Sequence, residues 1–161
     1  MNDRVTQVMT EPQGWYDAAQ AMQGDTVALR RAIHAEPELG LQTPKTLAKV
    51  RAALAGLPLE WKTGPSTTGA VAVLRGARPG RTVLLRGDMD ALPMPEDTGL
   101  AFRSTVEGTM HACGHDTHTA MLASAARILC ARRESPLLRQ GEQGRGHPAL
   151  VAQFFQLIFN G

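Results

Sequence analysis

Residues 81–92 read RTVLLRGDMDAL, and this stretch decides the fold class more than any other part of the chain. The mostly apolar run from Thr82 to Leu85 is typical of a strand buried on both faces, as in a sheet sandwiched by helices. In an extended chain, Asp88 and Asp90 would point the same way, at the strand end where α/β sheets bind ligands. Paired carboxylates are costly unless a cation or proton joins them, but a solvated acidic turn explains them equally well.

The sequence around this strand predicts a layered α/β domain. Apolar residues at helical spacing predict helices over 25–35, 44–54 and 117–132. Short strands are expected over 59–62 and 69–74, the latter from alternating valines. Asp116 is well placed to cap the last helix, because its carboxylate can accept hydrogen bonds from exposed backbone N–H groups. Helices, strands and a further helix in this order predict helices packed on a sheet.

Composition excludes several classes of protein. With 161 residues, 43% of them apolar, the chain is the size of one ordinary domain with a real core. The net charge of +2 is scattered, which gives no case for nucleic-acid or membrane binding, and no apolar run is long enough to span a bilayer. Residues 1–20 do not have the pattern of a secretion signal. Cys113 and Cys130 lack disulfide-framework spacing, so we expect a reducing, cytoplasmic location.

A second motif, MHACGHDTHT, occupies residues 110–119. A thiolate at Cys113 and an imidazole at His115, with a glycine between them, suit a borderline-soft ion such as Zn²⁺. Two alternatives stay open. Cys113 is either a small buried residue beside histidines at a helix start, or a nucleophile activated by a nearby histidine. Neither this motif nor the paired aspartates is specific alone.

Together the motifs GDMDALP at 87–93 and HACGHD at 111–116, with RAIHAEPELG at 31–40, carry a resemblance. They resemble the hippurate hydrolase and indole-acetyl-amino-acid hydrolase branch of the metallo-carboxypeptidase and aminoacylase superfamily. The resemblance covers roughly residues 20 to 133. It implies an incomplete α/β catalytic domain with helices on a mixed sheet. It also implies metal-dependent hydrolysis of the amide bond in small N-acyl amino acids, with Zn or Mn as the divalent metal.

The resemblance also assigns residue roles. Cys113 and His115 match the first two metal ligands of the family, and Cys113 would bridge the two ions of an intact site. Asp90 matches the catalytic aspartate, which supports the metal centre from behind its ligands. His111 is left open, and Cys130 is expected in the core. Three residues of matching motifs receive no ligand role: Asp88, His34 and His118.

The segments at either end differ from the matched part. We divide the chain into an N-terminal segment at 1–20, poorly ordered at its start, the family-like part at 21–134 and an atypical tail at 135–161. The family follows its next strand with a Glu-Glu-Gly turn that supplies a general base and a ligand. Either Glu142 and Gln143 take these positions, or 151–156 is the strand and the positions fall on Phe159 and Asn160. The second alignment is preferred because it supplies an apolar run.

Both alignments leave the glutamate pair incomplete. We therefore expect a metal-dependent amidohydrolase by resemblance whose metal site is weak or partial and which lacks activity as this chain alone. The alternatives are a small non-catalytic metal-binding module and an inactive gene-model fragment. Oligomeric state is not predicted, because the family's dimerisation domain is absent from the sequence.

Overall fold

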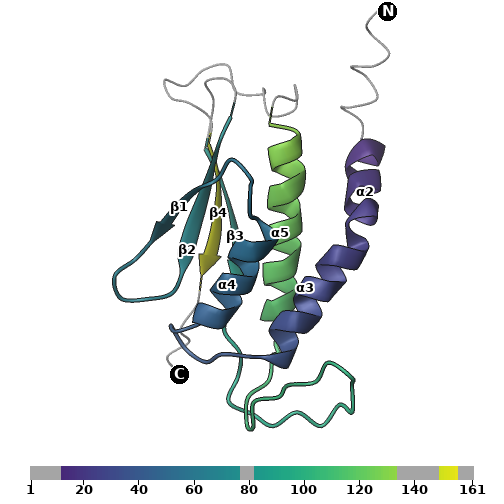
Figure 1. Ribbon diagram of the computed structural model, residues 1–161, viewed down its shortest axis with the longest axis vertical. Coiled ribbons are helices and arrows are strands. Elements are labelled where there is room, and N and C mark those ends of the chain that lie inside the picture. The colour runs from purple at the N-terminus through teal and green to yellow at the C-terminus, as the bar shows by residue number, and fades with distance from the viewer. Residues whose placement is uncertain (1–11, 77–81, 134–148, 156–161) are drawn as a thin grey trace, which may run out of the picture.

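The computed structural model of the protein describes residues 12–76, 82–133 and 149–155 (Figure 1). The helices are α2 (Pro12–Ala21), α3 (Gln23–Ala35), α4 (Pro44–Ala53) and α5 (His115–Ala131), and the strands are β1 (Glu60–Thr63), β2 (Ala70–Arg75), β3 (Val83–Asp88) and β4 (Ala149–Phe155). Every helix and strand expected between residues 25 and 132 is confirmed within a few residues of its ends. None of the described helices combines the length and apolar character that crossing a bilayer requires.

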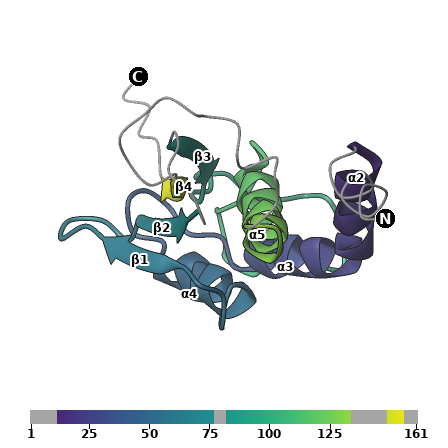
Figure 2. The ribbon, with the colours of Figure 1, turned by 90° about the horizontal axis from the view of Figure 1, so that it is seen from above.

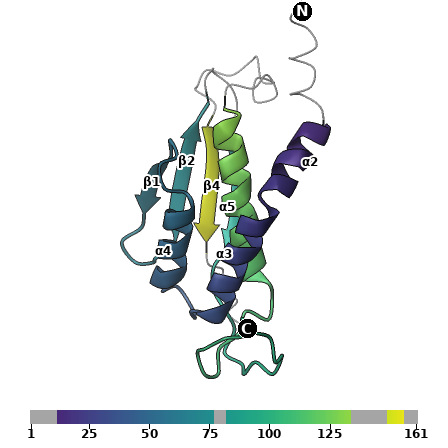
Figure 3. The same cartoon turned by 45° about the vertical axis from the view of Figure 1, so that its right-hand side comes forward.

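The strands form one mixed sheet in the order β1-β2-β4-β3. β2 pairs antiparallel with β1 and with β4, whereas β3 and β4 are parallel, with Leu85 opposite Ala152. The strand expected within 151–156 is thus confirmed as β4, and Figure 3 shows it inside the sheet. The tail therefore joins β2 to β3, which have no direct pairing. The two glutamate positions proposed for the tail lie outside the described residues.

Helices α4 and α5 pack on the same side of the sheet (Figure 2). Val50 of α4 and Leu54 at its C-cap meet Ala72 of β2 and the apolar face of α5 in one core. Met89, directly after β3, is completely buried in the same cluster. Its burial directs the chain inward between the two aspartates, so this core positions the residues that carry the chemistry.

Helix α2 was not anticipated from the sequence. It lies farthest from the sheet (Figure 2) and contains three good helix formers, Ala18, Ala19 and Ala21. The Arg132 guanidinium stacks over the Trp15 ring at 4.7 Å and donates to the Gly14 carbonyl oxygen at 2.6 Å. These contacts come from the far end of α5, so local sequence alone gave no sign of them.

The expectation that Thr82–Leu85 is buried on both faces is wrong for the residues described. Val83 and Leu84 are 53% and 57% exposed. The reason is topological, because β3 is the last strand of the sheet and pairs only with β4 among the described strands. A continuous apolar run is equally compatible with an edge strand, and periodicity does not distinguish the two.

Candidate metal centre

The end of β3 lies against the first turns of α5. The Thr119 hydroxyl donates a hydrogen bond to the Asp88 carbonyl oxygen at 2.5 Å. A Cβ atom added at Gly87 would meet the His118 carbonyl oxygen at 3.0 Å, so only glycine permits this approach without a shift. The strand end and the helix start are therefore held together, with the Asp88 side chain beside α5.

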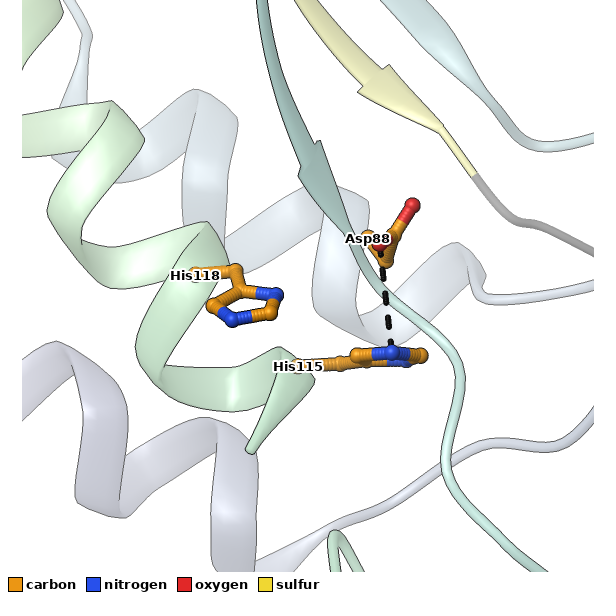
Figure 4. Close-up of side chains that lie close together, drawn as sticks. All are labelled: Asp88, His115 and His118. Carbon is orange, nitrogen blue, oxygen red and sulfur yellow. Dashed lines mark ion pairs between the residues drawn. The ribbon is translucent and has the colours of Figure 1, made fainter. Parts of the chain in front are cut away.

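His115 lies between the carboxylates of Asp88 and Asp90. Figure 4 shows its ion pair with Asp88. Its Nδ1 atom is 3.0 Å from Asp90 Oδ1 and 3.0 Å from the Asp90 carbonyl oxygen. Its Nε2 atom is 3.8 Å from Asp88 Oδ2. Because both Nδ1 partners are acceptors, Nδ1 carries the hydrogen of a neutral ring, which leaves the Nε2 lone pair facing Asp88. The two aspartates therefore point the same way, as expected, and both face His115.

His118 completes a group with metal-ligand spacing. Ligand atoms of Asp88, His115 and His118 all lie within 4.8 Å of one another. Histidines three residues apart on a helix lie on one face, which explains why both rings reach the strand end (Figure 4). One carboxylate oxygen and two imidazole nitrogens are donors that Zn²⁺ and Mn²⁺ accept.

The structure brings only some of the residues expected from the sequence together. Asp90 and His115 are in contact, whereas Cys113 is an exposed free thiol and does not belong to the described group of three. Its ligand role stays a prediction. Asp88 and His118 were given no role, although the three-residue spacing from His115 was a signal for His118. Cys130 is a buried free cysteine on α5, which confirms its place in the core.

Asp116 is not the N-cap residue of α5, so that part of the expectation is wrong, although its carboxylate does accept a backbone N–H of the first turn. The helix begins at His115, two residues before the expected start, and Gly114, with a φ of +83°, occupies the N-cap. The fully buried Asp116 carboxylate is instead 2.6 Å from His34 Nδ1 and 2.8 Å from Arg30 Nε. It also accepts the Thr117 N–H at 2.8 Å. A buried charge needs such partners, so tertiary contacts override the local capping preference.

Two further groups near Asp116 have shifted pKa values. Burial lowers the pKa of His111 to about 4, although the charge of Asp116 opposes this. Neither His111 ring nitrogen has a hydrogen-bond partner among the described residues. Burial raises the pKa of Glu96, but hydrogen bonds from the Ser104 N–H, the Thr98 hydroxyl and His34 outweigh it and lower the pKa to about 2.

A pocket opens beside the group of three. It has a volume of about 440 Å³ and is lined by Asp88 and His118 together with Leu85 and Met121. Met121 is 53% exposed, one turn beyond His118 on α5. The pocket thus places apolar surface next to the candidate ligands.

Comparison with known proteins agrees with this geometry. Residues 84–142, which include the paired aspartates and the start of α5, match Peptidase family M20/M25/M40. Thermostable carboxypeptidase 1 of Saccharolobus solfataricus is 46% identical over 109 residues, which cover 67% of this chain and 28% of that protein. The chain belongs to the M20 family.

Two other M20 relatives confirm the resemblance expected from the motifs. The N-acyl-L-amino acid amidohydrolase of Geobacillus stearothermophilus is 44% identical over 110 residues, covering 68% of this chain and 30% of that protein. The crystal structure of the YXEP protein of Bacillus subtilis, a dinuclear metal-binding peptidase from the M20 family, matches with a TM-score of 0.70 and 36% identity over 84% of this chain and 35% of its own. The chain spans less than a third of the length of the Saccharolobus and Geobacillus relatives.

Proposed function

We propose that this chain supplies the Asp88, Asp90 and His115 part of a divalent-metal centre that hydrolyses amide bonds. The observation that carries the proposal is the placement of His115, with Nδ1 at 3.0 Å from Asp90 Oδ1 and Nε2 at 3.8 Å from Asp88 Oδ2. A carboxylate on one imidazole nitrogen fixes the tautomer and makes the other nitrogen a better metal ligand. Asp90 therefore orients His115, in agreement with the role that the resemblance gave it.

The donor atoms fit Zn or Mn. Asp88, His115 and His118 would hold the ion, and Cys113 would be a further ligand, as the resemblance implies. A divalent metal polarises the carbonyl of the scissile amide. The chain's own contribution is to hold the donors: Met89 anchors the turn between the aspartates, and Thr119 fixes the strand end to α5.

The proposed substrates are N-acyl amino acids, including hippurate. Support comes from the name of the Geobacillus relative and from the pocket beside Asp88. Leu85 and Met121 give that pocket apolar surface suited to the hydrocarbon part of an acyl group. We also propose a cytoplasmic location, which suits two free cysteines.

Zn²⁺ titration by calorimetry tests the metal centre. We expect the wild-type chain to bind Zn²⁺ and His115→Ala to weaken binding by more than about tenfold, since even partners behind the ligands are worth that much. Asp88→Asn should also weaken binding, and its control is Asp97→Asn at an exposed site in the following loop. Equal affinity of wild type and His115→Ala would overturn the proposal.

Cobalt spectroscopy separates the two candidate ligand sets. A thiolate bound to Co²⁺ gives a sulfur-to-metal charge-transfer band, so this band should vanish in Cys113→Ser if Cys113 is a ligand. His118→Ala should instead alter the ligand-field bands and leave any thiolate band in place. Suppose that the wild-type spectrum has no thiolate band and that its ligand-field bands change in His118→Ala. This result would assign the site to Asp88, His115 and His118 alone.

Hydrolysis of hippurate and N-acetyl amino acids, with and without a chelator, tests the reaction. Turnover abolished by the chelator supports the amidohydrolase. Bound metal without turnover supports the non-catalytic metal-binding module. Turnover that resists the chelator but stops on thiol alkylation would instead make Cys113 a nucleophile.

A further inference from the structure

A buried polar group lies behind the candidate metal centre and connects three parts of the chain. Arg30 and His34 come from α3, Asp116 from the first turn of α5, and Glu96 from the long loop between β3 and α5, which extends beyond the ends of the helices (Figures 1 and 3). None of these residues belongs to the candidate ligand group. We propose that His34 is a positioning residue, which sets the place of His115 through its hydrogen bond to Asp116. This proposal rests on the metal centre proposed above.

The first step is the position of Asp116. Its side chain is completely buried, and one carboxylate oxygen accepts the Thr117 N–H of its own helix. The other oxygen contacts His34 Nδ1 at 2.6 Å and Arg30 Nε at 2.8 Å. A buried carboxylate is stable only when it contacts such partners. The positions of Arg30 and His34 on α3 therefore fix the position of the first turn of α5.

The second step is the position of His34. Its side chain is 3% exposed, and its Nε2 atom is 3.2 Å from Glu96 Oε1. Glu96 is itself held by the Ser104 N–H at 2.7 Å and by the Thr98 hydroxyl. Each nitrogen of the ring thus lies within hydrogen-bond distance of a carboxylate oxygen. His34 is therefore fixed between the loop on one side and α5 on the other.

The third step leads to the metal. His115 immediately precedes Asp116, so a rotation or slide of this helical turn moves the His115 ring relative to Asp88 and Asp90. Metal-ligand distances tolerate deviations of only about 0.2 Å. A small loss of order at Asp116 is thus expected to weaken metal binding without unfolding the protein, because Arg30 still compensates its charge.

Two substitutions of His34 separate its two hydrogen bonds. His34→Asn keeps a donor near the place of Nδ1, facing Asp116, whereas His34→Gln keeps one near the place of Nε2, facing Glu96. The matched control is Thr26→Val on the same helix. Thr26 Oγ1 lies 2.6 Å from the Ser124 hydroxyl, so this variant also removes a contact between α3 and α5, but two turns away from the helix start.

The experiment combines Zn²⁺ titration, thermal melting and NMR of the metal-free protein. We expect His34→Gln to lower Zn²⁺ affinity by about tenfold or more, in the range for partners behind metal ligands, and to shift the ring resonances of His115. His34→Asn should rescue both properties. Thr26→Val should lower the melting temperature but change neither the affinity nor the His115 resonances.

Each outcome is decisive. If His34→Gln binds Zn²⁺ as tightly as wild type, His34 is only a structural contact and the proposal is overturned. The same holds if Thr26→Val lowers the melting temperature and the Zn²⁺ affinity as much as His34→Gln does. If wild type binds no Zn²⁺, the metal centre fails separately. The His115 resonances of the metal-free protein then decide the positioning role. A shift in His34→Gln that is absent from His34→Asn and Thr26→Val supports it, and unchanged resonances in His34→Gln refute it.

Discussion

Two arginine–aspartate ion pairs between α3 and α5 differ in their access to water. Beside the candidate metal centre, Arg30 Nε is 2.8 Å from Asp116 Oδ2, and the Asp116 side chain is fully buried. Further along the same helices, Arg127 Nη1 is 2.9 Å from Asp25 Oδ2, with 37% and 67% of these side chains exposed. The distances are nearly equal, so distance does not decide what each pair contributes.

Burial decides it. When one partner of an exposed pair is removed, water solvates the other, and such pairs are typically worth ~0–1 kcal/mol. When one partner of a buried pair is removed, the remaining charge stays in a medium that solvates it poorly. The contacts that hold the start of α5 are therefore those that water cannot replace, and they lie where His115 needs a fixed position.

The largest decrease in the free energy of unfolding is expected for Asp116→Ala. It leaves the buried His34 and the 28% exposed Arg30 without their shared acceptor. Breaking a fully buried pair typically costs about 3–5 kcal/mol, and partial hydration of Arg30 places the expected loss toward the lower end of this range. Urea denaturation should show this loss, with Asp25→Ala as the matched control from the exposed pair. A loss in Asp116→Ala no larger than in the control would remove the distinction between the two pairs.

Lowering the pH should decrease the free energy of unfolding in two steps. Protonation of His111 on unfolding causes the first step. Its pKa is about 4 in the folded protein, below its ordinary value of 6.5. The unfolded chain therefore binds a proton that the folded chain does not, so stability falls as the pH drops below 6.5 and this decline levels off near 4. His111→Gln should remove this step from denaturation curves measured across that range. A wild-type protein with constant stability over it would contradict the burial of a neutral His111.

The second step belongs to Glu96. Its folded pKa of about 2 lies below the ordinary 4.5, so its stabilising contribution is complete above pH 4.5 and is lost as the pH falls toward 2. Glu96→Gln should flatten this part of the curve. The change appears only below pH 4.5, and an unchanged slope in the variant would show that other carboxylates cause it.

The smallest change in the free energy of unfolding is expected for Arg127→Gln. Removing the exposed pair with Asp25 should change the free energy of unfolding by less than about 1 kcal/mol. Zn²⁺ affinity should not change, because the contact lies three turns beyond His115 on α5. A larger loss in urea denaturation would mean that the two ion pairs are energetically coupled.

The elements of the fold were predictable where periodicity and turn residues were strong. The helices at 25–35 and 117–132 repeat apolar residues at helical spacing, and Ile33 and Leu122 among them are buried, whereas Met121 is 53% exposed. Helix α2 depends on Trp15 meeting Arg132, and the edge position of β3 depends on where β4 inserts. Neither is encoded in a local pattern.

The candidate site was predictable only in part. The spacing of Asp88 and Asp90 indicated two carboxylates on one side, and both indeed face His115. The contact of His34 with Asp116 joins residues 82 positions apart, so no spacing rule anticipates it. Of Asp88, His115 and His118, only His115 was assigned as a ligand from the sequence. The contacts of His34 with Asp116 and Glu96 were not anticipated.

Anomalous diffraction from zinc-soaked crystals tests the central claim most directly. Data collected on both sides of the zinc absorption edge should show a peak within coordination distance of His115 Nε2 and of Asp88 Oδ2. The peak should disappear in His115→Ala crystals soaked in the same way. A wild-type crystal with no peak at His115, or with zinc only at sites that avoid both residues, would contradict the account.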